Sequence, residues 1–312
     1  MIDFRYHLVS IVAVFLALGI GILMGSLVLG EALVNQLRRD LDNIDETNNR
    51  LRAETVELNR QLDANQQFAL ATRPYLIGGK LDGEQVVVFA FEGSEGDMLE
   101  EIRGSVTDSG GTVATTVTLR DKLAASSAPE RNELALVVDS QAESTSELLD
   151  ATGSILGTSF AAAADSPAGD PSERDALEEL VRDLEAGGFI DVDRNEEVPL
   201  APPNAVFVIA AGAEEPSGIE VAELAVPLGR ELAADRAGVI AAEPSTSSWG
   251  LVASVRNDSD TNASVGTVDQ AESISGGIGV VLALDLAENG VVTHSGTDSG
   301  AQAVIPLSSP SP

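Results

Sequence analysis

Cysteine is absent from the 312-residue sequence. Disulfide bonds and thiolate metal sites are therefore excluded, although a chain without cysteine can function in any compartment. Other soft-metal ligands are scarce: the sequence has three methionines (Met1, Met24, Met98) and two histidines (His7, His294), with no pair at ligand spacing. Because Cu(I) prefers Cys or Met and borderline ions prefer His, we predict no dedicated copper site within one chain. A site shared between chains, or one built from carboxylates that favour hard ions, remains open.

Aromatic residues and lysine are also rare, and acidic residues dominate the charged ones. Only 4% of the residues are aromatic, so a core must be built from Ala, Val, Leu and Ile, and Lys80 and Lys122 are the only lysines. The formal net charge is -32, and residues 66–312 hold 12 basic against 41 acidic groups. So acidic a domain repels nucleic acid and anionic lipid, which argues against both as its partners. The acidity is compatible with a high-salt habitat, and a sink for cations is the alternative interpretation.

One long hydrophobic run stands near the start of the chain. Leu8 to Leu29 carries no charged side chain and meets the length of roughly 20 apolar residues that a membrane-spanning helix needs. A secretory signal has a shorter apolar region of about 7 to 15 residues, so we predict a permanent transmembrane helix over residues 8–30. Cleavage near the small residues Val28 and Gly30 is the alternative. We expect segment 1–7 to stay in the cytoplasm while the acidic domain crosses the membrane.

Small residues recur every four positions within this run, at Ala13, Ala17, Gly21 and Gly25. This spacing places them along one face of a helix, where small side chains let two helix backbones approach closely in lipid. The stripe therefore predicts helix packing within the membrane. Because glycine is common in membrane helices, the alternative is that no specific pairing occurs.

A heptad pattern follows the hydrophobic run. No Pro or Gly occurs from Glu31 to Arg73, and the positions of an a/d seam recur in alternating steps of three and four. The seam comprises Val34, Leu37, Leu41, Ile44, Asn48, Leu51, Thr55, Leu58, Leu62 and Asn65. Asn48 falls at an a position, where a buried Asn fixes the register and favours two strands. We predict a coiled-coil stalk over residues 31–73, as a parallel homodimer or paired with another envelope protein. A single amphipathic helix lying on its own domain is the alternative.

Residues 74–305 are predicted to form an extracytoplasmic α/β domain, and residues 306–312 a flexible tail. Pro74 and Gly78-Gly79 are expected to end the long helix. The alternating pattern predicts a three-layer domain with a mostly parallel sheet. Predicted strands are 86–91, 112–119, 133–140, 205–212, 237–244 and one within 300–312; predicted helices are 96–110, 170–187, 219–235 and 273–290.

The sequence offers little catalytic chemistry. The turn FEGSEGDML after the first strand occupies the place where α/β sheets bind dinucleotides, but it is not GxGxxG, and its Glu92, Glu95 and Asp97 would repel a pyrophosphate. No P-loop lysine motif, HExxH or GxSxG occurs. Nothing in the spacing places His294 in a triad, so we predict a structural role for it. We therefore predict no catalytic residue, no bound cofactor and no enzyme activity.

The opening residues MIDFRYHLVSIVAVFLALGIGI closely resemble the start of an actinobacterial envelope family named after the mycobacterial copper transport protein B. The resemblance returns in GTVDQAES, GGIGVVLALDLAENG and THSGTDSGAQAVIP, and so covers essentially the whole chain. It implies a role in copper efflux or homeostasis, with copper as a transported ion, and a proposed pore across the outer membrane. Relatives also look like division factors that act with a second anchored coiled-coil protein, so a scaffold for envelope assembly or division is the alternative.

The resemblance and the residues differ in two places. The family motif is roughly Gly-His-Tyr-Gly, whereas residues 293–296 are Thr-His-Ser-Gly, so only His294 and Gly296 match. A transmembrane barrel needs many alternating strands of about ten residues, whereas the predicted strands are fewer than eight and mostly buried on both faces. A pore of single helices would need a polar stripe, and the hydrophobic run offers only Ser10 and Ser26. The resemblance therefore supports a copper-related role more than it supports a conduction mechanism.

Overall fold

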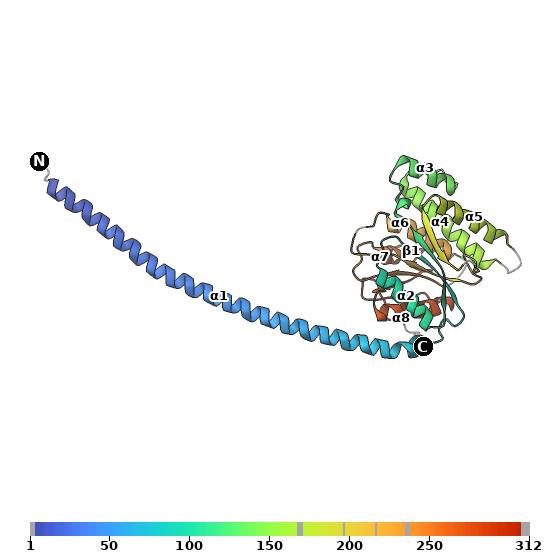
Figure 1. Ribbon diagram of the computed structural model, residues 1–312, viewed down its shortest axis with the longest axis horizontal. Helices are drawn as coiled ribbons and strands as arrows, with labels where there is room; N and C mark the ends of the chain where they lie inside the picture. The colour runs from blue at the N-terminus through green and yellow to red at the C-terminus, as the bar shows by residue number, and fades with distance from the viewer. Residues whose placement is uncertain (1–3, 167–170, 196, 216, 235–237, 307–312) are drawn as a thin grey trace. The chain divides into compact units, whose positions relative to one another are not determined.

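One long helix leads into an α/β unit. The computed structural model describes residues 4–166, 171–195, 197–215, 217–234 and 238–306, and leaves the side chains of residues 4 and 26–33 undescribed. The chain divides into two compact units, Met1–Gln66 and Gln67–Pro312. Helix α1 (Phe4–Ile77) forms the first unit and continues into the second (Figure 1).

Helix α1 ends one turn later than Pro74 suggests. Pro74 lies inside the last turn, where its missing N–H removes a single helical hydrogen bond. The backbone N–H of Gly78 still donates to the carbonyl oxygen of Pro74 at 3.2 Å. Gly79 then adopts a φ of +75°, which favours glycine and turns the chain out of the helix. The expectation that the two glycines end the helix is confirmed, and the expectation for Pro74 is wrong by one turn.

The α/β unit is built on one seven-stranded sheet with the order β3-β2-β1-β4-β5-β6-β7. Every neighbouring pair is parallel except β2 with β3, so the predicted mostly parallel sheet is confirmed. The strands are β1 (Gln85–Phe91), β2 (Thr112–Leu119), β3 (Ile190–Arg194), β4 (Val206–Ala210), β5 (Val239–Glu243), β6 (Gly266–Asp269) and β7 (His294–Ser295). β1, β4 and β5 are almost wholly buried, because helices cover both faces of the sheet.

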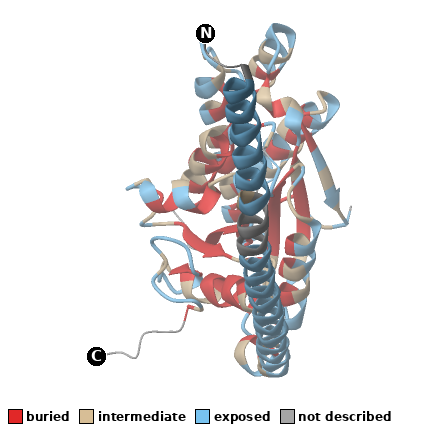
Figure 2. Cartoon of the chain, turned by 90° about the vertical axis from the view of Figure 1, so that its left-hand side faces the viewer, coloured by how far each residue is buried: buried red, intermediate tan, exposed pale blue. Residues whose placement is uncertain are grey.

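Helices form a layer on each face (Figure 1). One face carries α2 (Gly96–Asp108), α8 (Ile274–Glu288) and the last turn of α1. The other carries α3 (Ala128–Val137), α4 (Thr145–Asp165), α5 (Ser172–Ala186), α6 (Val221–Leu232) and α7 (Leu251–Asn257), with the short 3-10 helix η1 (Asp121–Ala124). Figure 2 shows the buried strands and inner helix faces in red, and the first unit in pale blue.

Each face of the sheet has its own hydrophobic core. The larger one gathers the few aromatic side chains: the Phe89 ring lies edge-on to Phe160 with centroids 4.9 Å apart, and 6.3 Å from Phe207. In the second core, Met98 and Ile102 of α2 pack with the apolar side chains of α8. Phe91 and Phe189 also belong to the larger core, and nearly all other side chains of both cores are aliphatic, as the low aromatic content predicts.

Two predicted strands are wrong. Residues 133–140 lie largely in α3, because Ser127 and Glu130 form a capping box and Pro129 stands in the first turn, both of which start helices. Within 300–312, Ala303 makes only an isolated bridge to Ser295, and residues 307–312 lie outside the described part. The edge strands β3 and β7, the short strand β6 and the helices α4 and α7 were not predicted.

Helix α4 packs unusually closely on α6. A Cβ at Gly157 would lie 2.7 Å from the carbonyl oxygen of Leu228, and one at Gly153 would overlap that of Leu224. Only glycine allows the two backbones to approach this closely. This contact holds the larger core together beneath β1 and β4.

Candidate functional site

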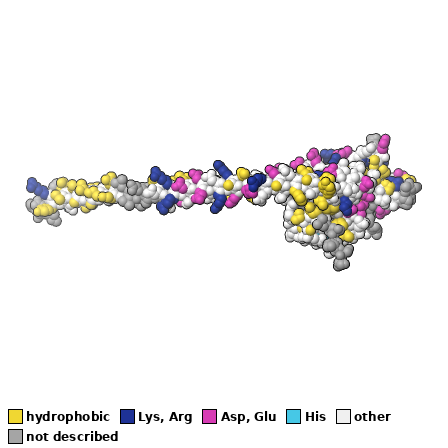
Figure 3. All heavy atoms as spheres, turned by 90° about the horizontal axis from the view of Figure 1, so that it is seen from below, with side chains coloured by type: hydrophobic (Ala, Val, Ile, Leu, Met, Phe, Trp, Pro, Cys, Tyr) yellow, Lys and Arg dark blue, Asp and Glu magenta, His cyan; other side chains and the backbone are white. Residues whose placement is uncertain are grey.

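The first unit presents an apolar helix surface. Among the described residues, one helix is long and apolar enough to cross a membrane, Arg5–Gly25, with a mean hydropathy of 2.6. Nothing lies within 4 Å of the space above Gly21 or Gly25, so that face is open. Figure 3 shows hydrophobic side chains over this first part and charged ones further along the helix.

The heptad seam is exposed in the single chain. Its apolar members Val34, Leu37, Leu41, Ile44, Leu51, Leu58 and Leu62 are each 50% to 64% exposed. A regular row of this length exceeds the scattered apolar residues of an ordinary surface and is typical of an interaction face. The structure thus shows the stripe that the heptads predict, while the partner that would cover it stays a prediction.

The second unit has the topology of a ligand-binding sheet, but its ligand edge is closed. The chain runs from β1 outward to β2 on one side and from β4 to β5 on the other, so the switch point of the sheet lies between β1 and β4. Ligands of such sheets bind in the crevice beyond the carboxyl ends of these strands. Here the N–H of Glu95 donates to the carbonyl oxygen of Gly212 at 3.0 Å, which joins the two loops across the switch point.

A loop after β5 fills the remaining space. The Trp249 ring lies against Gly93, where an added Cβ would be 3.7 Å from the ring, and its indole N–H donates to the carbonyl of Glu215 at 2.6 Å. Thr246 donates to the carboxylate of Glu95 at 2.5 Å. Glu95, one of the three carboxylates that were expected to repel a pyrophosphate, therefore holds this loop, and the protein's own side chains lie in the crevice.

The motifs near the chain's end meet in one buried network. Arg256 of α7 and Asp269 at the end of β6 form an ion pair at 3.0 Å, and both are almost fully buried. The Arg256 guanidinium also donates to Thr267 Oγ1 at 2.8 Å and to the Ser295 carbonyl at 2.9 Å. Asp269 accepts from the N–H of Thr297 at 2.6 Å and from that of the next residue. Both carboxylate oxygens are thus in use.

His294 is held on both ring nitrogens. Thr267 Oγ1 accepts from Arg256 and so donates its own proton to Nδ1 of His294, 3.0 Å away. The amide nitrogen of Asn262 donates to the Arg256 carbonyl, which leaves its oxygen to accept from Nε2–H of His294 at 3.2 Å. Burial, followed by the charge of Arg256, lowers the pKa of His294 below its ordinary 6.5. The ring is therefore neutral and satisfied, as a structural histidine should be.

The structure explains why the second matching residue of the motif, Gly296, is a glycine. It adopts a φ of +128°, and an added Cβ would overlap the carboxylate of Asp269. His294 therefore supports the Arg256–Asp269 ion pair through Thr267, and Gly296 leaves room for the carboxylate of Asp269. Sequence reasoning singled out these two residues but missed Arg256 and Asp269, since a buried pair separated by 13 positions leaves no periodic signal.

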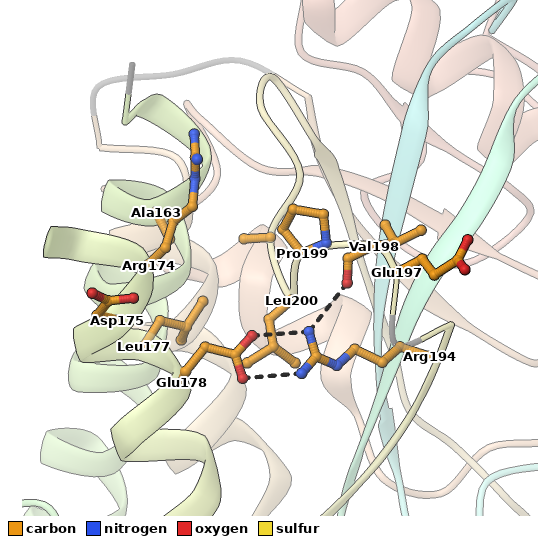
Figure 4. A pocket seen from close by; sticks show the side chains of 11 residues that line it. Ala163, Arg174, Asp175, Leu177, Glu178, Arg194, Glu197, Val198, Pro199 and Leu200 are labelled. Carbon is orange, nitrogen blue, oxygen red and sulfur yellow. Dashed lines mark hydrogen bonds and ion pairs between the residues drawn. The ribbon is translucent and has the colours of Figure 1, made fainter. Parts of the chain in front are cut away.

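One cavity of about 320 Å³ lies between α5 and the loop that follows β3 (Figure 4). Its central charge, Arg194, donates to both carboxylate oxygens of Glu178 at 2.9 and 3.0 Å and to the Val198 carbonyl at 3.1 Å. Such a bidentate pair satisfies the guanidinium. The Arg194–Glu178 pair therefore ties the edge strand β3 to α5, and Arg194 presents no unpaired charge to a ligand in the cavity.

Metal ligands do not converge in the described part of the chain. No group of three or more His, Asp or Glu side chains there could hold a metal ion. Met98 is buried in the second core, and both nitrogens of His294 are engaged. The donor set therefore does not fit a resident copper ion, because soft ions need sulfur or free imidazole ligands.

These features define a class: proteins that join a long helix with an apolar first segment to a doubly wound α/β unit whose ligand edge is closed. The family profile described as "Copper transport outer membrane protein, MctB" matches residues 1–306, and the chain belongs to this family. "Copper transporter MctB" of Mycobacterium tuberculosis (strain ATCC 25618 / H37Rv) is 30% identical over 321 residues, which cover 97% of this chain and 99% of that protein. The Mycobacterium leprae (strain TN) protein of the same name is 28% identical over the same shares. The resemblance seen in the sequence is thereby confirmed.

Proposed function

We propose that this chain is a single-pass, helix-anchored envelope protein that serves copper homeostasis. The family match along residues 1–306 carries this proposal, because it includes the apolar helix, the heptads and the α/β unit together. Relatives that align over almost their whole length are named copper transporters. We propose no catalytic role, since the crevice that would hold a substrate or nucleotide is filled by the Trp249 loop.

We propose that copper is a transported ion and not a bound cofactor. The described residues of one chain offer no cluster of imidazoles and carboxylates, and their sulfur atoms are those of Met24 in the apolar helix and of the buried Met98, so we propose that a copper effect is indirect or depends on several chains. An anchored protein can act indirectly by organising other components of the envelope. This distinguishes a role in homeostasis from conduction through the chain itself.

The exposed seam supports pairing of the stalk. We propose a parallel two-stranded coiled coil over residues 31–73, with Asn48 fixing the register and the small residues from Ala13 to Gly25 extending contact into the membrane. The partner is a second copy of this chain or the coiled coil of another envelope protein. Burial of the seven apolar seam residues, each now at least half exposed, supplies the driving force.

The proposed topology places residues 1–7 in the cytoplasm and the α/β unit outside the cytoplasmic membrane. The apolar segment Arg5–Gly25 supports one crossing, and the strongly acidic remainder is suited to an aqueous compartment. The family description names the outer membrane, which is a further possible location. Protease access to the α/β unit in intact spheroplasts tests the orientation: full protection contradicts it.

A scaffold in envelope assembly or division is the second candidate function. Two observations favour it, the long exposed seam of the first unit and the closed ligand edge of the second, since both suit a protein that binds proteins rather than small molecules. In this case a link to copper would follow from a disturbed envelope.

Copper content and tolerance in a deletion strain separate the two candidates. Loss of tolerance with raised copper content, restored by the intact gene, supports copper homeostasis. Unchanged copper with misplaced or thickened septa supports the scaffold. Complementation with Leu51→Asp, which places a charge in the seam, shows whether either phenotype needs the coiled coil. Asp42→Asn, at an outward position of the same helix, is the matched control.

A further inference from the structure

The heptad phase of the seam does not stop at Asn65. Continuing the same steps places Ala69 and Leu76 at a positions and Thr72 at a d position, and helix α1 runs on to Ile77. By sequence alone, a second helix could pair with this last heptad, Ala69–Tyr75, just as it pairs with the heptads before it.

In the structure this face is already covered within the second unit. Ala53 and Ala64 of the upstream helix are exposed, whereas Ala69 and Thr72 are half-buried. Leu76 packs against the second hydrophobic core, and Ile77 is fully buried in it. At the seam phase, Leu76 therefore contacts the chain's own α/β domain, and Ala69 and Thr72 are partly covered.

An ion cluster centred on the buried Arg73, here called the clasp, holds this contact. It consists of Arg73, Glu101, Ser105 and Asp108. Arg73 pairs with Glu101 at 3.1 Å through one guanidinium nitrogen and with Asp108 at 3.0 Å through another. It also donates to Ser105 Oγ at 2.9 Å, and Ser105 Oγ donates to Glu101 at 2.9 Å.

The helix that faces the clasp is shaped around it. An added Cβ at Gly277 of α8 would overlap Glu101 and Ser105, so the GGIG stretch leaves room for the cluster. Because a guanidinium that loses its partners while buried is costly, the clasp is either closed or fully open to water. It joins α1, α2 and α8 as one two-state contact.

We propose that the α/β domain and a second copy of this chain compete for the same face of the last heptad. With the clasp closed, the paired stalk ends at Asn65. When the clasp opens, the two helices can pair onward through Ala69, Thr72 and Leu76. This inference rests on the proposed pairing and adds its regulation. A change at the α/β domain that opens the clasp would lengthen the coiled coil. Conversely, tension on the stalk would change how the domain docks on the end of α1.

Single-cysteine variants of the full-length protein in detergent test this cleanly, because the chain has no cysteine of its own. Leu58→Cys reports on the proposed seam, and Ala69→Cys and Thr72→Cys report on the last heptad. Ala71→Cys, which is exposed and off the seam, measures chance collision. A copper-free oxidant then forms disulfides wherever the Cβ atoms of two helices come within about 4.5 Å.

Leu58→Cys should cross-link, and Ala69→Cys and Thr72→Cys should do so at least ~10-fold more slowly, because an open state at about 0.1–10% population limits them. Adding Arg73→Met, which keeps the aliphatic stem but removes the charge, should raise cross-linking at both positions toward that of Leu58→Cys. Ala71→Cys should stay at its low level. Asp108→Lys, on the more exposed side of the clasp, provides a second way to open it should Arg73→Met fail to fold.

The outcomes separate the two proposals. If Leu58→Cys does not cross-link, the pairing is refuted and this inference with it. If Leu58→Cys and Ala69→Cys cross-link equally with an intact clasp, the pairing stands and the competition is refuted. The competition is also refuted if neither clasp variant raises cross-linking at Ala69→Cys while Trp249 fluorescence shows a folded domain.

Discussion

A charge reversal at Asp45 tests the register of the proposed stalk. In a parallel, in-register pair of two copies, each g position faces the e position of the next heptad in the partner. Asp40 stands at g and Asp45 at e, so the two carboxylates face each other twice by symmetry. Neither forms an ion pair with a neighbouring cation among the described side chains. Asp45→Lys turns both repulsive contacts into attractive ones.

The size of the effect follows from exposed ion pairs. Each exposed pair contributes about 0.3–0.5 kcal/mol, and like charges cost a similar amount, so reversing two contacts stabilises the dimer by about 1–2 kcal/mol. The dissociation constant should fall roughly 5- to 30-fold at low salt. Molar salt should remove most of the gain, because the Debye length shortens to about 3 Å.

Sedimentation of the full-length protein in detergent measures this change. Asp42→Lys is the matched control, since it makes the same charge change at an outward b position and should leave the dissociation constant nearly unaltered. The double variant Asp40→Lys with Asp45→Lys restores a like-charge pair and should lose the gain, which completes a double-mutant cycle. Equal effects of Asp45→Lys and Asp42→Lys, or a double variant as tight as the single one, refute the parallel in-register homodimer.

Two further predictions concern the fold. Gly153→Ala should lower the free energy of unfolding by about 1–3 kcal/mol, because the added methyl group would overlap the Leu224 carbonyl. Gly96→Ala is the control, since open space lies above Gly96 and the free energy of unfolding should not fall. Denaturation followed by Trp249 fluorescence compares the two variants, and equal stability would contradict the close α4–α6 contact. The lowered pKa of His294 means that the folded protein binds fewer protons than the unfolded one, so stability should fall as pH drops below about 6.5 and level off below the folded pKa. His294→Gln cannot titrate and should flatten this part of the pH profile; an unchanged slope would show that His294 is not its source.

A third prediction concerns Glu288, whose pKa is raised to about 7 by burial and by the neighbouring carboxyl of Glu84. Here the folded state binds the extra proton, so stability should decline as pH rises from about 4.5 toward 7, and Glu288→Gln should remove that decline in urea titrations. A decline that persists in the variant assigns it to other groups.

The central sheet could be predicted from the sequence because its strands carry strong local signals. β1, β2, β4 and β5 are unbroken apolar or β-branched runs bounded by glycine or acidic turns, and each lies where the pattern places it. Strands β6 and β7 were missed because they are only four and two residues long. Strand β3 was missed because its sequence IDVDR alternates apolar with charged residues at the edge of the sheet and forms no apolar run. Residues 133–140 were predicted as a strand because they form a short apolar run, and periodicity cannot distinguish a strand from a short helix in such a run.

The same contrast between local and tertiary signals applies to the candidate sites. The apolar segment is a continuous run, and the small-residue stripe and the seam recur at regular spacing, so all three are visible in the sequence alone. The Arg256–Asp269 pair, the clasp around Arg73 and the loop that closes the crevice depend on residues brought together by tertiary packing. In the sequence these sites leave only single signs, such as Gly296 and the GGIG stretch. The reason that glycine is needed there is seen only in the structure, where the carboxylates of Asp269 and Glu101 occupy the space of a side chain.

The position of these glycines bears on what the family resemblance means. The segments GTVDQAES, GGIG and THSGTDSG, which carry the resemblance at the chain's end, supply Asp269, Gly277, His294 and Gly296. Each of these residues is engaged in holding the sheet edge or the clasp, and none presents a free ligand atom to copper or to a substrate. These motifs therefore specify how the domain is built and how it holds the last turns of α1. If the proposed pairing holds, the helix surface that one chain leaves uncovered is where a second chain would contribute ligands to a shared site.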